Sequence, residues 1–227
     1  MRIPGLLRVA EGNPAQHPGG DSGAVVWAAA PLLARFLWEI PTEELDGRVA
    51  IELGCGVGLP SLTLALRGVR NVIATDGDQG VLEKVTRVNV DMNADLFESC
   101  PTLQRLPWGD PEAVAAVIAS CPTLASGTPA LIVASDVLYD AHGDSALALT
   151  LRTFAEYCPS ARVLLAWQAR HVAREQAFFE SLADIFLCTP LIEEPCFDFF
   201  SDRPGSLHLV ELSHFARSQP EPVCNQL

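Results

Sequence analysis

The sequence predicts an α/β fold in which a mainly parallel sheet carries helices on both of its faces. Short apolar runs rich in Val, Ile and Leu alternate along the chain with longer segments whose apolar residues recur at helical spacing. The length of 227 residues suits one such domain with a full-sized core. With 49% apolar and 19% charged residues, the composition excludes a disordered, collagenous or coiled-coil chain.

The expected elements follow one another in strict alternation. Strands are predicted because these segments are short, apolar and bounded by turn signals: 49–53, 71–75, 103–106, 130–135, 162–167 and 206–212. Helices are predicted from apolar spacing and capping residues: 22–40, 59–67, 78–93, 111–120, 145–157 and 172–186. The domain is expected to span 22–215, between a loosely ordered arm (1–21) and a frayed tail (216–227).

The charge of the chain limits the classes of partner that it is expected to bind. The formal net charge is −13, so a non-specific grip on nucleic-acid phosphates is disfavoured. A basic protein surface is the easier partner.

Cysteine and histidine patterns indicate the compartment. The seven cysteines include no C-x-x-C pair, and the five histidines form no H-E-x-x-H motif. We expect reduced thiols, no bound metal and a cytoplasmic protein, with the nucleus as a further possibility. The N-terminal apolar stretch is too short for a signal peptide, and the uncharged segment 113–135 is interrupted by Pro122, Gly127 and Pro129. No membrane segment is expected.

The strongest functional signal is a glycine-rich turn between the first strand and its helix. It reads Glu52-Leu53-Gly54-Cys55-Gly56-Val57-Gly58. Glycines allow a tight turn and let backbone N–H groups approach a ligand at a helix N-terminus. The spacing G-x-G-x-G, with an acid two residues before the first glycine, favours a sulfonium nucleoside over a pyrophosphate.

A second signal is Asp76, at the end of the second strand and about twenty residues past the glycines. An acid at this place can accept hydrogen bonds from both ribose hydroxyls. Together with the glycine turn, Asp76 is predicted to be a ribose ligand.

With these motifs the chain resembles the seven-stranded S-adenosyl-L-methionine-dependent methyltransferases, which have a Rossmann-like class I fold. More narrowly it resembles the protein-lysine methyltransferases marked by an Asp-x-x-Tyr motif, here Asp136-Val137-Leu138-Tyr139. Further matching positions are Val26, Trp27, Asn89, Asn93, Trp108, Arg170, Phe178 and Phe179. The resemblance implies seven strands, with strand 206–212 antiparallel and inserted beside the fifth.

The resemblance also implies roles for single residues. Glu52 and the glycines Gly54, Gly56 and Gly58 would bind the methionine part of the cofactor. Trp108 would lie beside adenine, Trp27 would cover the cofactor, and Ser135 would line the same pocket. A Trp ring suits these places because its face stacks on a purine and attracts a cation.

Asp136 and Tyr139 are the predicted catalytic pair. Asp136 would draw a lysine ammonium into the pocket, and Tyr139 would aim its hydroxyl at the same nitrogen. The alternative is a structural role, with Asp136 capping a loop and Tyr139 serving as packing.

The expected function is methyl transfer to a lysine side chain of a protein substrate, by a chain that is monomeric. A histidine, an arginine or a small-molecule amine remains a possible acceptor. A methyltransferase fold used only as a binding module is the remaining alternative.

Overall fold

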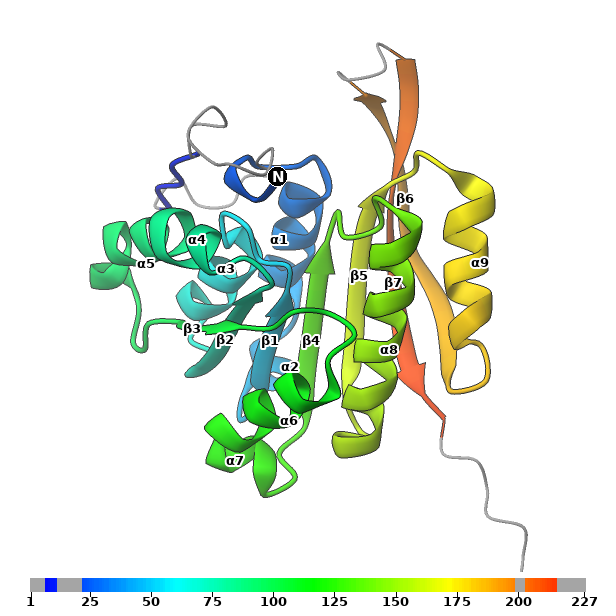
Figure 1. The fold of residues 1–227 in the computed structure, drawn as a ribbon. Helices are drawn as coiled ribbons and strands as arrows, with labels where there is room; N and C mark the ends of the chain where they lie inside the picture. Colours follow the sequence, from blue (N-terminus) through cyan, green and yellow to red (C-terminus); the bar gives the residue numbers. More distant parts are fainter. Residues whose placement is uncertain (1–6, 12–21, 199–202, 216–227) are drawn as a thin grey trace, which may run out of the picture.

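The computed structural model describes residues 7–11, 22–198 and 203–215, and these form a seven-stranded sheet in the order β3-β2-β1-β4-β5-β7-β6 (Figure 1). The strands are β1 (Val49–Leu53), β2 (Asn71–Asp76), β3 (Thr102–Arg105), β4 (Ala130–Ser135), β5 (Arg162–Gln168), β6 (Phe186–Asp198) and β7 (Arg203–His214). Strands β1 to β5 are parallel, and β7 is antiparallel to both β5 and β6. This confirms the predicted fold, including an antiparallel closing strand beside the fifth strand.

Helices cover both faces of the sheet. The described helices are α1 (Ala29–Glu39), α2 (Thr42–Leu45), α3 (Leu59–Leu66), α4 (Gln79–Val81), α5 (Arg87–Met92), α6 (Pro111–Ser120), α7 (Pro122–Ala125), α8 (Ala141–Tyr157) and α9 (Val172–Leu182). A π-helical turn, Leu82–Thr86, joins α4 to α5, so the predicted helix 78–93 is nearly continuous. Helices α6, α8 and α9 pack on one face, and α1 and α3 pack on the other (Figure 1).

The central strands are apolar along their whole length because both of their faces are covered. In β1, Ile51 packs on the side of α6 and α8, whereas Ala50 packs on the side of α1 and α3. All five residues of β1 are buried. Such runs are typical of parallel sheets between two helical layers.

Two helices begin at other residues than predicted. The first helix begins at Ala29 rather than Ser22, and residues Ser22–Ala24 form a separate 3-10 turn. Pro31 explains the shift, because proline is tolerated in a first helical turn and disfavoured in a helix interior. Helix α8 begins four residues before the predicted Ser145, since the Asp140 side chain accepts hydrogen bonds from two backbone N–H groups and caps it.

Strand β6 lies in a segment for which no strand was predicted. The predicted helix 172–186 ends at Leu182, and the chain then forms β6. Its prolines, Pro190 and Pro195, argue against a central strand. They are tolerated because, among the described strands, β6 lies at the edge of the sheet with β7 as its one neighbour.

The terminal segments are described only in part. Of the predicted arm, residues 7–11 are described, and the N–H groups of Arg8 and Ala10 donate hydrogen bonds to Asn93, at the end of α5, and to Asn89, within α5. The rest of the arm up to residue 21, and the predicted tail 216–227, lie outside the described residues.

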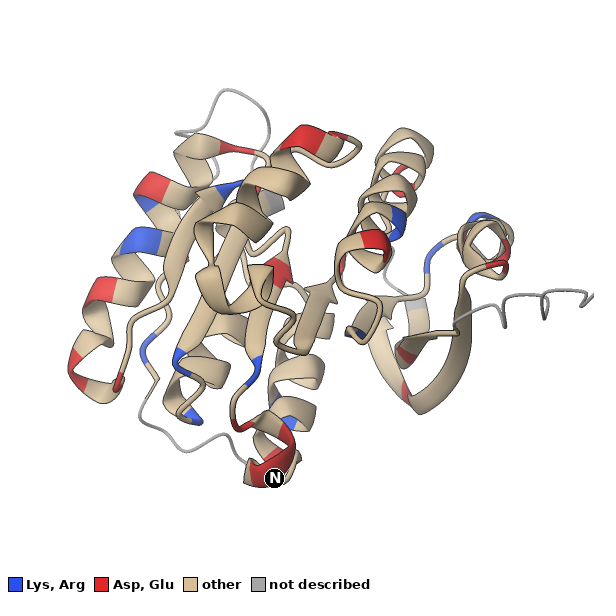
Figure 2. Ribbon diagram, turned by 90° about the horizontal axis from the view of Figure 1, so that it is seen from below, with Lys and Arg blue, Asp and Glu red and all other residues tan. Residues whose placement is uncertain are grey.

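Charge is spread over the molecule. Figure 2 shows the described Lys and Arg residues scattered over separate elements, with acidic residues on helices of both layers. Within the described ranges, no helix is long and apolar enough to cross a membrane, and no group of three His, Cys, Asp or Glu side chains could hold a metal ion.

Candidate active site

A pocket of about 840 Å³ opens at the carboxyl ends of the parallel strands. It lies where the strand order reverses between β1 and β4, which is where α/β sheets bind ligands. The loops after β1, β2, β3, β4 and β5 all contribute to it, and so does the segment before α1. Its predicted site residues are Trp27, Gly54, Gly56, Asp76, Trp108, Ser135, Asp136 and Tyr139.

The glycine turn has a conformation that needs glycine. Gly54 and Gly56 have φ angles of 65° and 49°, in the left-handed region. A Cβ on Gly54 would lie 2.8 Å from the Trp108 ring, and one on Gly56 would lie 3.0 Å from the carbonyl oxygen of Gly23. A side chain at either position would therefore collide with a neighbouring part of the protein, so the turn needs glycine at both. Gly58 precedes α3 and is not among the pocket residues.

Glu52 lies below the turn and not in the pocket wall. It is 1% exposed, and its Oε2 accepts hydrogen bonds from the backbone N–H of Ser61 at 2.9 Å and from the Ser61 hydroxyl at 2.5 Å. Burial raises the pKa of Glu52 to about 8. Its predicted contact with a cofactor stays a prediction.

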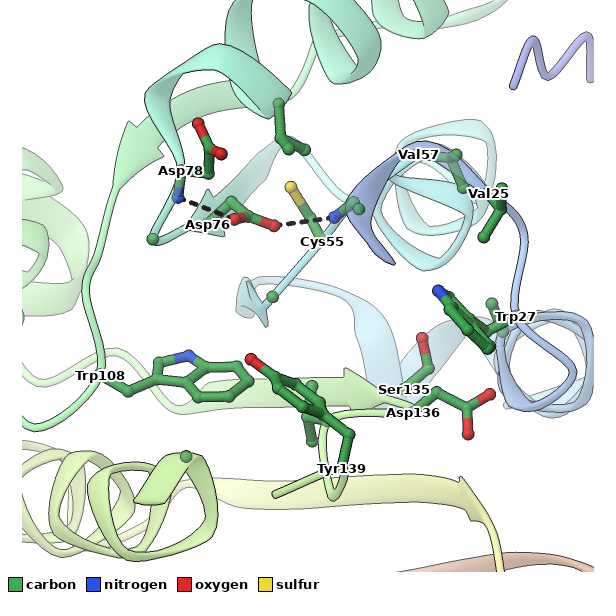
Figure 3. A pocket seen from close by; sticks show the side chains of 18 of the residues that line it. Val25, Trp27, Cys55, Val57, Asp76, Asp78, Trp108, Ser135, Asp136 and Tyr139 are labelled. Carbon is green, nitrogen blue, oxygen red and sulfur yellow. Dashed lines mark hydrogen bonds between the residues drawn. The ribbon is translucent and has the colours of Figure 1, made fainter. Parts of the chain in front are cut away.

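Asp76 lies directly beside the glycine turn (Figure 3). Its carboxylate accepts hydrogen bonds from the N–H of Gly56 at 3.1 Å and from the N–H of Asp78 at 3.0 Å. These bonds hold the side chain in place, and each carboxylate oxygen retains acceptor capacity. Burial raises the pKa of Asp76.

Aromatic rings stand on two sides of the pocket. Figure 3 shows Trp108 and Tyr139 together on one side and Trp27 on the other. The Trp108 and Tyr139 ring centroids are 6.2 Å apart, at 42° to each other. The indole N–H of Trp108 is buried and has no hydrogen-bond partner among the described residues. The guanidinium of Arg170 lies over the Trp27 ring, 5.5 Å from its centroid.

Asp136 is engaged by three donors from three parts of the chain. Its carboxylate accepts hydrogen bonds from the backbone N–H of Ala29 at 2.7 Å, from the N–H of Gln168 at 3.0 Å and from Arg170 at 3.2 Å. The side chain is 1% exposed and points away from Tyr139 (Figure 3). Its backbone has a φ of 52°, a conformation that Asp tolerates better than most residues. These contacts favour the structural alternative for Asp136 over direct contact with an amine.

Tyr139 is 53% exposed and lines the pocket near its outer side. The residue before it, Leu138, accepts a hydrogen bond from Arg174 at 3.1 Å, and Arg174 pairs with Asp144 at 2.8 Å. The loop 136–139 is thus held at both ends, by Asp136 and by Arg174. Partial burial and neighbouring acids raise the pKa of Tyr139 above its usual value, so its hydroxyl stays protonated at neutral pH.

Several wall residues had no predicted site role. They are Gly23, Val25, Ala30, Cys55, Val57, Gly77, Asp78, Val81, Pro107, Val137, His142, Gly143, Ala146 and Arg170. Most of them flank a predicted motif by one to four positions, which is the signal that could have found them. Arg170 matched the family pattern without an assigned role, and only the fold shows that it reaches Asp136.

Comparisons with known proteins agree with this architecture. "SAM-dependent methyltransferase from Anabaena variabilis" has a similar fold, with a TM-score of 0.54 over 82% of this chain and 83% of that chain at 14% identity. Protein N-lysine methyltransferase METTL21A of Mus musculus is 30% identical over 175 residues, covering 76% of this chain and 72% of the relative.

A further relative is Protein N-terminal and lysine N-methyltransferase efm7 of Aspergillus fumigatus, 29% identical over 119 residues. The match covers 52% of this chain and only 45% of that relative. A family profile described as "Lysine methyltransferase" matches residues 14–185, which is most of the chain. The protein therefore belongs to the lysine methyltransferase family, as its glycine turn and Asp-x-x-Tyr motif predicted.

Proposed function

We propose that the protein is an S-adenosylmethionine-dependent methyltransferase that modifies a lysine side-chain nitrogen of a protein substrate. One observation carries the proposal: in a chain of this family, a single pocket joins the glycine turn and Asp76 to the half-exposed Tyr139. A cofactor held by the first two elements would present its reactive end toward the third.

The residues of the pocket suit this cofactor. Gly54 and Gly56 line the pocket without side chains, so the backbone of the turn can approach the methionine part, and Asp76 has free acceptor capacity for ribose hydroxyls. The buried, unpartnered N–H of Trp108 is a donor that a bound purine could satisfy. The bound cofactor would supply an electrophilic methyl group on a sulfonium.

The part of the protein is mainly to position the acceptor. An in-line displacement needs a neutral amine, aligned with the methyl carbon and close to it. The protonated hydroxyl of Tyr139 can donate to or accept from that amine and so aim its lone pair. Trp27 and Trp108 would exclude water from the reacting atoms and offer ring faces to the cation.

Asp136 is proposed to act through other residues. By binding the N–H of Ala29 and the Arg170 guanidinium, it holds the start of α1 and the side chain that lies over Trp27. We propose this positioning role in place of direct attraction of the substrate ammonium.

The proposed partner is a basic, lysine-presenting protein surface, because the chain carries a net charge of −13. Nucleic acid is an unfavourable partner for the same reason, and we propose that the enzyme acts as a monomer. Within the part of the chain that the structure describes, Cys55, Cys100, Cys121, Cys158 and Cys188 are free thiols, which supports a reducing compartment, the cytoplasm or the nucleus.

Incubation with methyl-labelled S-adenosylmethionine and cell lysate tests the function. We expect label on a discrete protein band and, by mass spectrometry, on a lysine of that protein. Label on a histidine, an arginine, an N-terminal amine or a small amine would redirect the proposal. Cofactor binding without any transfer would support the binding-module alternative.

Asp76→Ala should weaken binding of S-adenosylmethionine at least tenfold, because two ribose hydroxyls lose a charged acceptor. Calorimetry measures the dissociation constant. Asp95→Ala, an exposed acid in the short helical turn after α5, is the matched control and should bind as the wild type does. An unchanged dissociation constant for Asp76→Ala would remove Asp76 from the cofactor site.

Tyr139→Phe should lower the methylation rate by about ten- to a hundredfold if the hydroxyl aims the amine. Because the ring and its contact with Trp108 are retained, melting temperature and cofactor affinity should stay close to those of the wild type. Tyr157→Phe, at the exposed end of α8, is the control. Wild-type turnover in the Tyr139→Phe protein would contradict the proposed role of the hydroxyl and would mean that only the ring contributes.

A further inference from the structure

Two asparagines bind the N-terminal arm through their side-chain amides. Asn93 accepts a hydrogen bond from the N–H of Arg8 at 2.8 Å and donates one to the carbonyl of Arg8 at 2.7 Å. Asn89 does the same with Ala10, at 2.7 Å and 3.0 Å. Both asparagines are fully buried. They therefore pair with alternate residues of the arm, as a neighbouring strand would.

The spacing explains why this pairing works. Residues four apart on a helix are separated by about 6 Å along the axis. Alternate residues of an extended chain are about 6.6 Å apart. Asn89 and Asn93 thus present their amides at nearly the repeat of an extended segment.

The two asparagines together form a clamp on the arm, and this clamp also contacts the pocket. Asn89 also donates to the carbonyl oxygen of Val57, in the glycine turn, at 3.0 Å. The arm residues Leu7 and Val9 pack against an apolar cluster that includes Val57. The clamp is therefore tied to the floor of the cofactor site as well as to the arm.

The arm in turn reaches the pocket wall before α1. The carboxylate of Glu11 accepts a hydrogen bond from the N–H of Val26 at 2.8 Å. The neighbours of Val26 in the chain, Val25 and Trp27, line the pocket, as does Gly23. Holding residues 8–11 against α5 thus also holds the segment 23–27.

We infer that Asn89 and Asn93 are positioning residues of the cofactor site, which clamp residues 8–10 and thereby hold the wall segment 23–27 over the glycine turn. The inference rests on the proposed cofactor. The asparagine side chains and the backbone of the arm depend on each other, because a buried amide left without its hydrogen-bond partner costs free energy. Loss of either the asparagine amides or the arm contacts should loosen the wall segment 23–27 and lower the affinity for the cofactor.

The test uses two single variants and their combination in the full chain. Asn93→Ala removes the amide, and Arg8→Pro removes the backbone N–H that binds it. With S-adenosylhomocysteine as the probe, we expect each variant to raise the dissociation constant about tenfold. The dissociation constant of the double variant should be at most about twofold higher than that of the single variant that binds more weakly, since both changes break the same contact.

Hydrogen exchange and a control separate positioning from general stability. Without ligand, the amides of 23–27 should exchange faster in both variants, while those of β4 and β5 keep their wild-type protection. Asn71→Ala, at the exposed start of β2, should alter neither affinity nor exchange.

Wild-type affinity in both variants would overturn the inference. So would equal acceleration of exchange in the wall segment and in the central strands, which would mean that the clamp only adds stability. Failure of the wild-type protein to bind S-adenosylhomocysteine at millimolar concentration would instead overturn the proposed cofactor.

Discussion

Asp136→Ala is expected to lower the free energy of unfolding by about 3 to 5 kcal/mol, the cost of breaking a buried charge pair by removing one partner. The substitution leaves the N–H groups of Ala29 and Gln168 and the guanidinium of Arg170 without their acceptor. Alanine also tolerates the φ of 52° less well than Asp does. For a chain of this length the melting temperature should fall by about 10 °C.

The size and kind of this effect distinguish the two interpretations of Asp136. If the Asp136 carboxylate only contacted the substrate amine, the Asp136→Ala protein would have a lower turnover but the melting temperature and cofactor affinity of the wild type. If the carboxylate instead holds α1 and Arg170 in place, the Asp136→Ala protein should lose both stability and cofactor affinity. Urea unfolding, calorimetry and a methylation assay on the same preparation make the comparison.

Two further variants sharpen this test. Asp136→Asn keeps one acceptor oxygen and suits the same backbone conformation, so its loss of stability should be smaller than that of Asp136→Ala. Asp140→Ala removes an exposed helix cap a few residues away and should cost about 1 kcal/mol. An Asp136→Ala protein with wild-type stability and affinity would contradict the positioning role.

The sheet could be predicted largely because burial on both faces leaves a strong local pattern. Strand β4 is apolar at five of its six positions, and its predicted bounds are those observed. Strand β6 left no such pattern, since an edge strand tolerates the prolines and acids that a central strand excludes. The contact that holds the start of α1 was also beyond prediction, because the N–H of Ala29 donates to Asp136, a residue 107 positions away.

The candidate site shows the same division. Glycine is the residue that a left-handed backbone conformation requires, so the tight turn at Gly54 and Gly56 could be predicted from their spacing. The partners of a carboxylate depend on the tertiary fold. Asp136 resembles a catalytic acid in sequence, yet its three donors come from α1, β5 and the loop after β5. Asn89 and Asn93 matched the family pattern, but only the fold shows the arm that they bind.

Glu52 should make the stability of the protein fall as the pH rises. The folded protein retains a proton on Glu52 up to a pKa of about 8, whereas the unfolded chain loses it near the usual value of 4.5. Between these values the folded state binds more protons. The contribution of Glu52 is therefore fully present below pH 4.5 and is lost as the pH rises to 8. Burial of the carboxyl group, which disfavours its charged form, is the main cause of the raised pKa.

Glu52→Gln carries no charge at any pH and should remove this dependence while keeping an acceptor for Ser61. Relative to this variant, the wild type should lose about 5 kcal/mol between pH 4.5 and pH 8.5, at about 1.4 kcal/mol per pKa unit. Urea unfolding at four or five pH values measures the difference, in which the other titrating groups largely cancel. Glu43→Gln, at an exposed position in α2, should leave the profile of the wild type unchanged. Parallel profiles for the wild type and Glu52→Gln would show that Glu52 is ionised in the folded protein, and that its carboxylate is stabilised by more than the Ser61 hydrogen bonds.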